Sequence, residues 1–143
     1  MKAIFADTFF YLAVLNPADA AHRQAVNASR TLTAQTLTTA WVMTEVADAL
    51  AGPAQRPLFL DLLRRLSADS KVTIVPPTQE FFDRGVDFYA KRPDKQWSLT
   101  DCISFVVMAE HGLTEALTGD WHFEQAGFKV LLSKQRRTTP GQD

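Results

Sequence analysis

Cysteine is almost missing from this sequence, since Cys102 is the only one among its 143 residues. A single cysteine excludes an internal disulfide and a four-cysteine zinc site, and it is typical of proteins kept in a reducing cytosol. Long hydrophobic runs are missing as well. The longest, residues 3–15, is interrupted by Asp7 and is too short to cross a bilayer. We therefore expect a cytoplasmic protein that makes no contact with the membrane.

Neither sign of charge predominates in the composition. The 15 Lys and Arg residues stand against 16 Asp and Glu, for a net charge of −1, so any nucleic-acid binding must use local positive patches. Glycine-rich nucleotide-binding motifs are absent, which leaves nucleotide-cofactor roles without support. With 46% hydrophobic and 22% charged residues, the composition predicts one folded domain over residues 1–133 and a polar tail, 134–143, that we expect to be flexible.

Short apolar segments alternate with amphipathic segments along the chain. The predicted strands are Lys2–Ala6, Leu32–Leu37, Lys71–Val75, Glu115–Thr118 and Phe128–Leu132. The predicted helices are Thr8–Leu15, Asp19–Arg30, Trp41–Leu50, Leu58–Leu66, a segment that Thr78 caps and that runs up to Pro93, and Leu99–His111. Trp121–Ala126 is predicted to be a short turn or helix. The segment Leu99–His111 is apolar nearly all round, so we expect it to be central and buried. This alternation predicts an α/β sandwich with a largely parallel sheet.

Two aspartates directly follow predicted strands. Asp7 comes after the first strand, and Asp120 comes after residues 116–119. In an open parallel sheet, ligands bind beyond the carboxyl ends of the strands, so both carboxylates can share one site if the two strands are neighbours. The alternative is that each aspartate only caps the helix that follows it.

Two further acids lie within predicted helices. Glu45 falls at the edge of the apolar stripe of its helix, which directs it toward the core and requires a partner or a cation. Asp101 closes an S-x-x-D arrangement with Ser98, typical of a capping box. The alternatives are a boundary position that reaches water for Glu45 and a purely structural cap for Asp101.

Four carboxylates in one site would repel each other and would need a cation to stay ionised. Oxygen ligands of this kind suit Mg²⁺ or Mn²⁺, and such ions commonly serve phosphoryl-transfer chemistry. The residues thus favour metal-assisted hydrolysis of a phosphodiester.

The four acids stand in local sequences that are similar to a known family. An apolar strand ending in Asp7-Thr8, the Thr44-Glu45-Val46 helix, the segment 97–102 and the segment 118–128 resemble the four acidic positions of PIN domains, most closely those of VapC-type bacterial toxins. The resemblance covers residues 2–132. It implies a three-layer α/β/α sandwich with a five-stranded, mostly parallel sheet, and a Mg²⁺- or Mn²⁺-dependent ribonuclease.

The resemblance also implies roles for single residues and for partners. Asp7, Glu45, Asp101 and Asp120 would be the catalytic metal ligands, with the polar neighbours Thr8 and Thr118. His122 stands where family members often carry a further acid, and it is a candidate for contact with the scissile phosphate. The implied partners are an RNA substrate, a cognate antitoxin that blocks the acidic site, and a second copy in a homodimer. Two alternatives stay open: a PIN-like RNA- or protein-binding module that does not cleave, and a housekeeping RNA-processing nuclease.

A basic cluster precedes the third acidic position. Lys91, Arg92 and Lys95 lie just before Trp97, a combination that can hold RNA phosphates and stack a base. The alternative is a solvated charged loop. Lys134, Arg136 and Arg137 form a second cluster in the tail. Cys102 begins an apolar helix, which favours packing in the core over a nucleophilic role.

Overall fold

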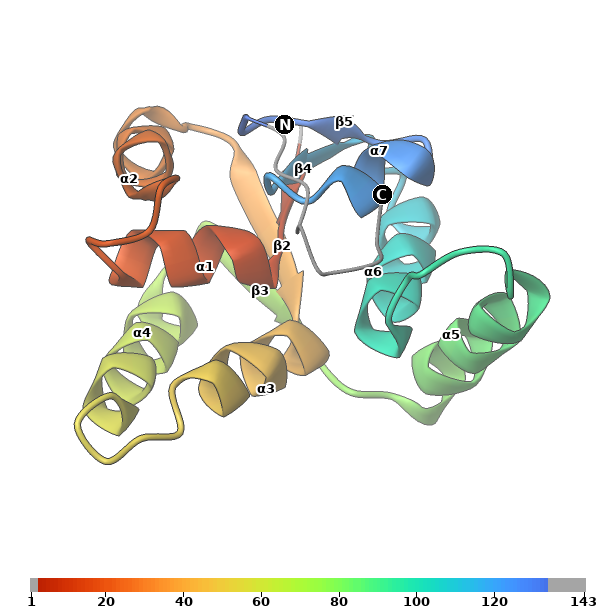
Figure 1. Cartoon of the computed structure of the whole chain (residues 1–143), viewed down its shortest axis with the longest axis horizontal. Coiled ribbons are helices and arrows are strands. Elements are labelled where there is room, and N and C mark those ends of the chain that lie inside the picture. Colours follow the sequence, from red (N-terminus) through yellow and green to blue (C-terminus); the bar gives the residue numbers. More distant parts are fainter. Residues whose placement is uncertain (1–2, 134–143) are drawn as a thin grey trace.

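A five-stranded sheet forms the centre of the structure, a computed structural model that describes residues 3–133 (Figure 1). Its strands are β1 (Ala3–Ala6), β2 (Gln35–Thr39), β3 (Val72–Val75), β4 (Glu115–Leu117) and β5 (Lys129–Val130). The order across the sheet is β3-β2-β1-β4-β5, and every neighbouring pair is parallel. The predicted parallel α/β architecture is therefore confirmed. The expected tail, with its second basic cluster, lies outside the described residues.

The first three residues of the predicted second strand are not part of it. The segment was expected to begin at Leu32, but β2 begins at Gln35. Leu32 instead ends the preceding helix, where its N–H donates to the carbonyl oxygen of Ala28. At its other end, β2 extends to Thr38 and Thr39, both fully buried, and the Thr38 hydroxyl donates to the Ala6 carbonyl at 2.9 Å. Two buried threonines and a hydrogen bond to β1 thus hold the carboxyl end of this strand in the sheet.

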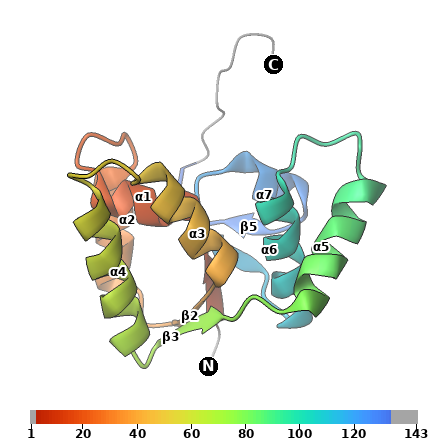
Figure 2. The same ribbon diagram turned by 90° about the horizontal axis from the view of Figure 1, so that it is seen from below.

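Helices cover both faces of the sheet. They are α1 (Thr8–Leu15), α2 (His22–Thr31), α3 (Ala40–Ala49), α4 (Arg56–Ala68), α5 (Gln79–Lys91), α6 (Leu99–Glu110) and α7 (Trp121–Gln125). Figures 1 and 2 show α1 to α4 on one side of the sheet and α5 to α7 on the other, which gives the predicted three layers. Helices α5 and α6 pack closely: a Cβ atom on Gly85 would lie 2.3 Å from Cγ1 of Ile103.

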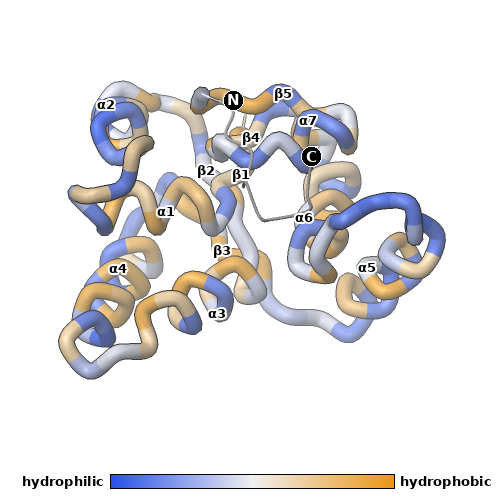
Figure 3. Tube along the Cα trace, viewed as in Figure 1, coloured by the Kyte–Doolittle hydropathy of each residue, from blue (hydrophilic) through white to orange (hydrophobic). Residues whose placement is uncertain are grey.

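The core joins the inner faces of these helices to the sheet. Its fully buried side chains include Phe5, Val42, Val46, Met108 and Phe123. Figure 3 shows hydrophobic and hydrophilic positions alternating around α4 and α5, as expected for helices with one buried face. Helix α6 is buried along most of its length, as its apolar sequence predicted. Among the described residues, no helix is both long and apolar enough to cross a membrane.

Candidate metal centre

Asp7 lies at the carboxyl end of the central strand β1. Ala6 pairs with Leu117 of β4, so the residues that follow these two strands are neighbours. The Asp7 side chain is only 3% exposed, and its Oδ2 accepts a hydrogen bond from the Thr118 hydroxyl at 3.0 Å. Although Asp7 precedes α1, its side chain does not make the capping hydrogen bond to the second or third residue of that helix, both of which the structure describes. The simple capping alternative therefore does not account for this aspartate.

The electrostatic surroundings of Asp7 are unfavourable for a carboxylate. Burial raises the pKa of Asp7 well above its ordinary value, and the negative charges of Asp101 and Asp120 raise it further. Hydrogen bonds from the Thr8 backbone and the Thr118 hydroxyl offset only part of this rise. The charges of two predicted acids thus act on a third, and a bound cation would relieve this repulsion.

Thr118 connects two of these acids. Its hydroxyl donates to Asp7 and accepts a hydrogen bond from the backbone N–H of Asp120 at 3.0 Å. The Oδ1 atom of Asp120 in turn accepts from the backbone N–H of His122 at 2.9 Å, which makes Asp120 the cap of α7. For Asp120, capping and a place in the acidic site therefore coexist.

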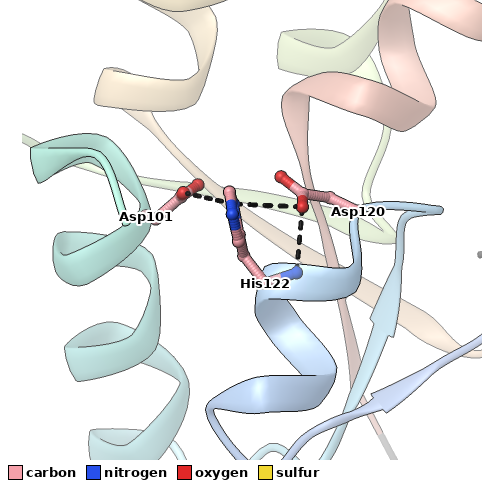
Figure 4. Close-up of side chains that lie close together, drawn as sticks. All are labelled: Asp101, Asp120 and His122. Atoms are coloured by element: carbon pink, nitrogen blue, oxygen red, sulfur yellow. Dashed lines mark hydrogen bonds and ion pairs between the residues drawn. The ribbon is translucent and has the colours of Figure 1, made fainter. Parts of the chain in front are cut away.

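Asp101 is held by the capping box that its sequence predicted. Its backbone N–H donates to the Ser98 hydroxyl at 3.0 Å, while its Oδ2 accepts from the Ser98 N–H at 3.2 Å. The same Oδ2 lies 3.6 Å from Nδ1 of His122, which is also 3.2 Å from Oδ1 of Asp120 (Figure 4). Asp101, Asp120 and His122 each offer one ligand atom within 4.8 Å of the others, an arrangement that could hold a metal ion.

Glu45 lies in the second turn of α3 and is half-buried, as its position at the edge of the apolar stripe predicted. Helix α3 begins directly after β2. It packs against α1, which follows Asp7, and against α6, which contains Asp101. The group formed by Asp101, Asp120 and His122 includes neither Glu45 nor Asp7. The roles of Glu45 and Asp7 as metal ligands stay predictions.

Buried hydroxyl groups accompany the acids. Within the described part of the chain, the Thr8 and Ser104 hydroxyl oxygens are buried and have no hydrogen-bond partner. Burial raises the pKa of Tyr11, and the charge of Asp7 adds to the rise. The sequence interpretation missed Tyr11 and Ser104, although they follow Asp7 by four residues and Asp101 by three, the spacings that share a helix face. Carboxylate oxygens such as those of Asp101 and Asp120 are ligands that suit a divalent cation, so the donor set fits Mg²⁺ or Mn²⁺.

Trp97, which follows the basic cluster, does not have the exposed position that base stacking requires. Trp97 is 4% exposed, its Nε1 donates to Oε1 of Gln125 at 3.1 Å, and its ring packs on Phe105 with centroids 5.1 Å apart. A base has no access to this ring, so the expected stacking role of Trp97 is wrong for this conformation. The Arg92 guanidinium lies over the same ring and also binds Asp94 through two hydrogen bonds of 3.0 Å.

The other two cations of the cluster, Lys91 and Lys95, are at least partly exposed to solvent. Lys91 is exposed at the end of α5, and Lys95 is half-buried with its Nζ 5.9 Å from the centre of the Trp97 ring.

Cys102 is buried, as predicted. Burial raises the pKa of its thiol to about 11, and the charge of Asp101 adds to the rise. Both effects disfavour a thiolate nucleophile at this position.

Comparisons with known proteins agree with this architecture. The PIN domain profile matches residues 4–129. The crystal structure of VapC20 from Mycobacterium tuberculosis, described as a toxin that cleaves the sarcin-ricin loop, aligns with a TM-score of 0.83 and 22% identity over 90% of this chain and 98% of that chain. No curated protein matches the sequence significantly.

Two further structures are also similar to this fold. A toxin-antitoxin complex from Klebsiella pneumoniae aligns with a TM-score of 0.65 and 19% identity over 93% of this chain and 99% of that chain. FitAcB from Neisseria gonorrhoeae aligns with a TM-score of 0.63 and 20% identity over 89% of this chain and 95% of that chain.

Proposed function

Because the chain belongs to the PIN domain family, we propose that it is a divalent-metal-dependent endoribonuclease and the toxin of a toxin–antitoxin pair. The observation that carries this proposal is the link from Asp7 through Thr118 to Asp120, which lies with Asp101 and His122 in a group that could hold a metal ion. Burial and the charges of Asp101 and Asp120 also raise the pKa of Asp7. Buried acids that destabilise one another are a cost to folding unless a ligand uses them. The similar structures, which include toxins and toxin–antitoxin complexes, support the biological part of the proposal.

The proposed ion, Mg²⁺ or Mn²⁺, would be held by Asp7, Asp101 and Asp120, with Glu45 as the proposed fourth acid. A bound divalent ion supplies Lewis acidity, which lowers the pKa of a water molecule and offsets charge on a phosphodiester. The protein's own contribution is positional. Thr118 fixes Asp7 relative to Asp120, and the capping box fixes Asp101 at the start of a buried helix. The side chains of Asp120 and His122 are 28% and 20% exposed, so substrate reaches the site from their side.

We further propose that a cognate antitoxin and a second copy of the chain are partners, and that the protein acts in the cytoplasm. The structure of a toxin–antitoxin complex with the same fold supports the first partner. Exposed apolar side chains on α4, such as Leu58 and Leu60, offer contact area for either partner.

Purified protein is expected to cut bacterial RNA at discrete positions in the presence of Mn²⁺ and not in EDTA. The reason is that the carboxylates alone offer no group that can stabilise the charge of a cleaved phosphodiester. Sequencing of new RNA ends measures the reaction, and growth arrest on expression tests toxicity. Cleavage that persists unchanged in EDTA would contradict the proposal, as would the absence of any metal-dependent cut in total RNA.

Replacement of Lys91, Arg92 and Lys95 together by Ala is expected to weaken RNA binding. A net charge of −1 gives no general attraction, so local cations must hold the phosphates, and each lost contact should flatten the salt dependence by roughly 0.7 in log–log slope on a single strand. Fluorescence anisotropy with labelled RNA in EDTA measures both quantities. Arg64→Ala with Arg65→Ala is the control, because these arginines pair with Asp61 on α4, across the sheet. An unchanged slope would place the RNA elsewhere.

A further inference from the structure

His122 occupies a position between two of the proposed metal ligands. Its Nδ1 lies 3.2 Å from Oδ1 of Asp120 and 3.6 Å from Oδ2 of Asp101. Figure 4 shows the imidazole ring between the two carboxylates, with its Nδ1 directed at both. The ring is therefore part of the acidic site and not a separate surface group.

The orientation of the ring is fixed by its neighbours. The backbone N–H of His122 donates to Asp120, which ties the start of α7 to that carboxylate. The Trp121 ring lies beside the imidazole, with the two centroids 4.9 Å apart. At the same time the side chain is 20% exposed, so an ion can reach it from solvent without opening the core.

The distances from Nδ1 of His122 to the two carboxylate oxygens are close to what a small cation requires. An ion with octahedral geometry and bonds of about 2.1 Å holds adjacent ligand atoms about 3 Å apart. The observed separations of 3.2 Å and 3.6 Å exceed this value only slightly. A small contraction would place Nδ1 and the two carboxylate oxygens around one ion.

We propose that His122 is a nitrogen ligand of the metal ion, and that the site consequently prefers a transition-metal ion to Mg²⁺. This inference rests on the proposed function, since it concerns the ion held by Asp101 and Asp120. Imidazole nitrogen binds Co²⁺, Ni²⁺ and Zn²⁺ well, whereas Mg²⁺ takes oxygen ligands almost exclusively. A site made only of carboxylates would favour transition-metal ions over Mg²⁺ less strongly.

A different role for His122 makes the opposite prediction. A positively charged imidazole could simply occupy the place of the ion and pair with both carboxylates. In that case His122 competes with every cation, and its removal strengthens the binding of Mg²⁺ and Co²⁺ alike.

Metal affinity in the untagged full-length protein separates these roles. Isothermal titration with CoCl₂ and with MgCl₂, at pH about 7.5 where free imidazole is mostly neutral, is to be done for the wild type, His122→Asn and His111→Asn. His111 is the matched control, because it is exposed at the end of α6. Circular dichroism in EDTA checks that each variant is folded. In the Co²⁺ form, proton NMR should show a hyperfine-shifted imidazole N–H signal that His122→Asn lacks.

We expect the wild type to bind Co²⁺ more than about tenfold more tightly than Mg²⁺. His122→Asn should weaken Co²⁺ binding at least about tenfold and change Mg²⁺ binding less than about threefold, with His111→Asn unchanged in both. Unchanged Co²⁺ affinity in His122→Asn, or tighter binding of both ions, overturns the role of His122 while leaving the proposed nuclease intact. A wild type that binds neither ion overturns the inference together with the metal dependence of the proposed function.

Discussion

Asp101→Asn is expected to give a folded protein that cuts RNA at least about 100-fold more slowly than the wild type. Loss of a residue that merely supports a metal ligand commonly costs about 10- to 100-fold, so loss of a ligand's charge should cost at least the upper value. The fold should persist, because the amide oxygen of Asn can accept the hydrogen bond from the Ser98 N–H that the carboxylate accepts now. The expected cost in stability is about 1 kcal/mol, from the lost charge at the first turn of α6.

Ser98→Ala separates the two roles of Asp101. This change removes the hydroxyl that accepts from the Asp101 N–H, yet leaves the carboxylate in place. It should cost about 1 kcal/mol of stability and leave RNA cleavage nearly unchanged. Initial rates on one RNA substrate, with thermal melting of the same preparations, provide both measurements. If Asp101→Asn cleaved at the wild-type rate, Asp101 would be only a cap, and the proposed site would lose one of its ligands.

Local patterns were enough to predict most of the architecture and part of the site. The apolar strand before Asp7, the capping box at Asp101 and the buried helix that follows it are all set by residues close together in the chain. The convergence of Asp7 and Asp120 followed from a general property of parallel sheets, and the register of β1 with β4 brings it about.

Such local patterns could not predict contacts between segments that are far apart in the sequence. Trp97 was considered for base stacking because a basic cluster precedes it, but its ring packs on Phe105 of α6 and its Nε1 donates to Gln125 of α7. The bridging role of Thr118 depends on a partner 111 residues away. The position of His122 between two carboxylates likewise requires α6 and α7 to be in place. Sequence identifies the residue types of the site, whereas the packing of these two helices decides which atoms face one another.

Asp7→Asn is expected to stabilise the protein in EDTA and to remove most of the stabilisation that Mn²⁺ provides. In the folded protein, burial and the charges of Asp101 and Asp120 raise the pKa of Asp7, whereas in the unfolded chain this pKa is about 3.9. A raised pKa in the folded state contributes stability at low pH, and this contribution is lost as pH rises above about 4. Asn escapes the loss because it carries no titrating proton, and its amide oxygen can still accept from Thr118.

A bound ion is expected to make the wild type more stable than Asp7→Asn. An ion that binds only the folded state adds about 2.7 kcal/mol at a hundredfold excess over its Kd, which corresponds to a rise in Tm of roughly 5–10 °C for a chain of this length. The wild type should gain this amount, and Asp7→Asn should gain little because the charge nearest the core is gone.

Thermal melting at pH about 5 and about 8, in EDTA and in millimolar Mn²⁺, tests the stabilisation by Asp7→Asn without metal and its reversal with metal. Asp48→Asn on the exposed side of α3 is the control and should follow the wild type throughout. In EDTA the advantage of Asp7→Asn should grow from the lower to the higher pH, and in Mn²⁺ it should become a disadvantage. A wild type that is the more stable protein in EDTA at the higher pH would mean that the fold itself stabilises the Asp7 carboxylate. The buried acids would then require no cation, and the main physical argument for a metal site would be lost.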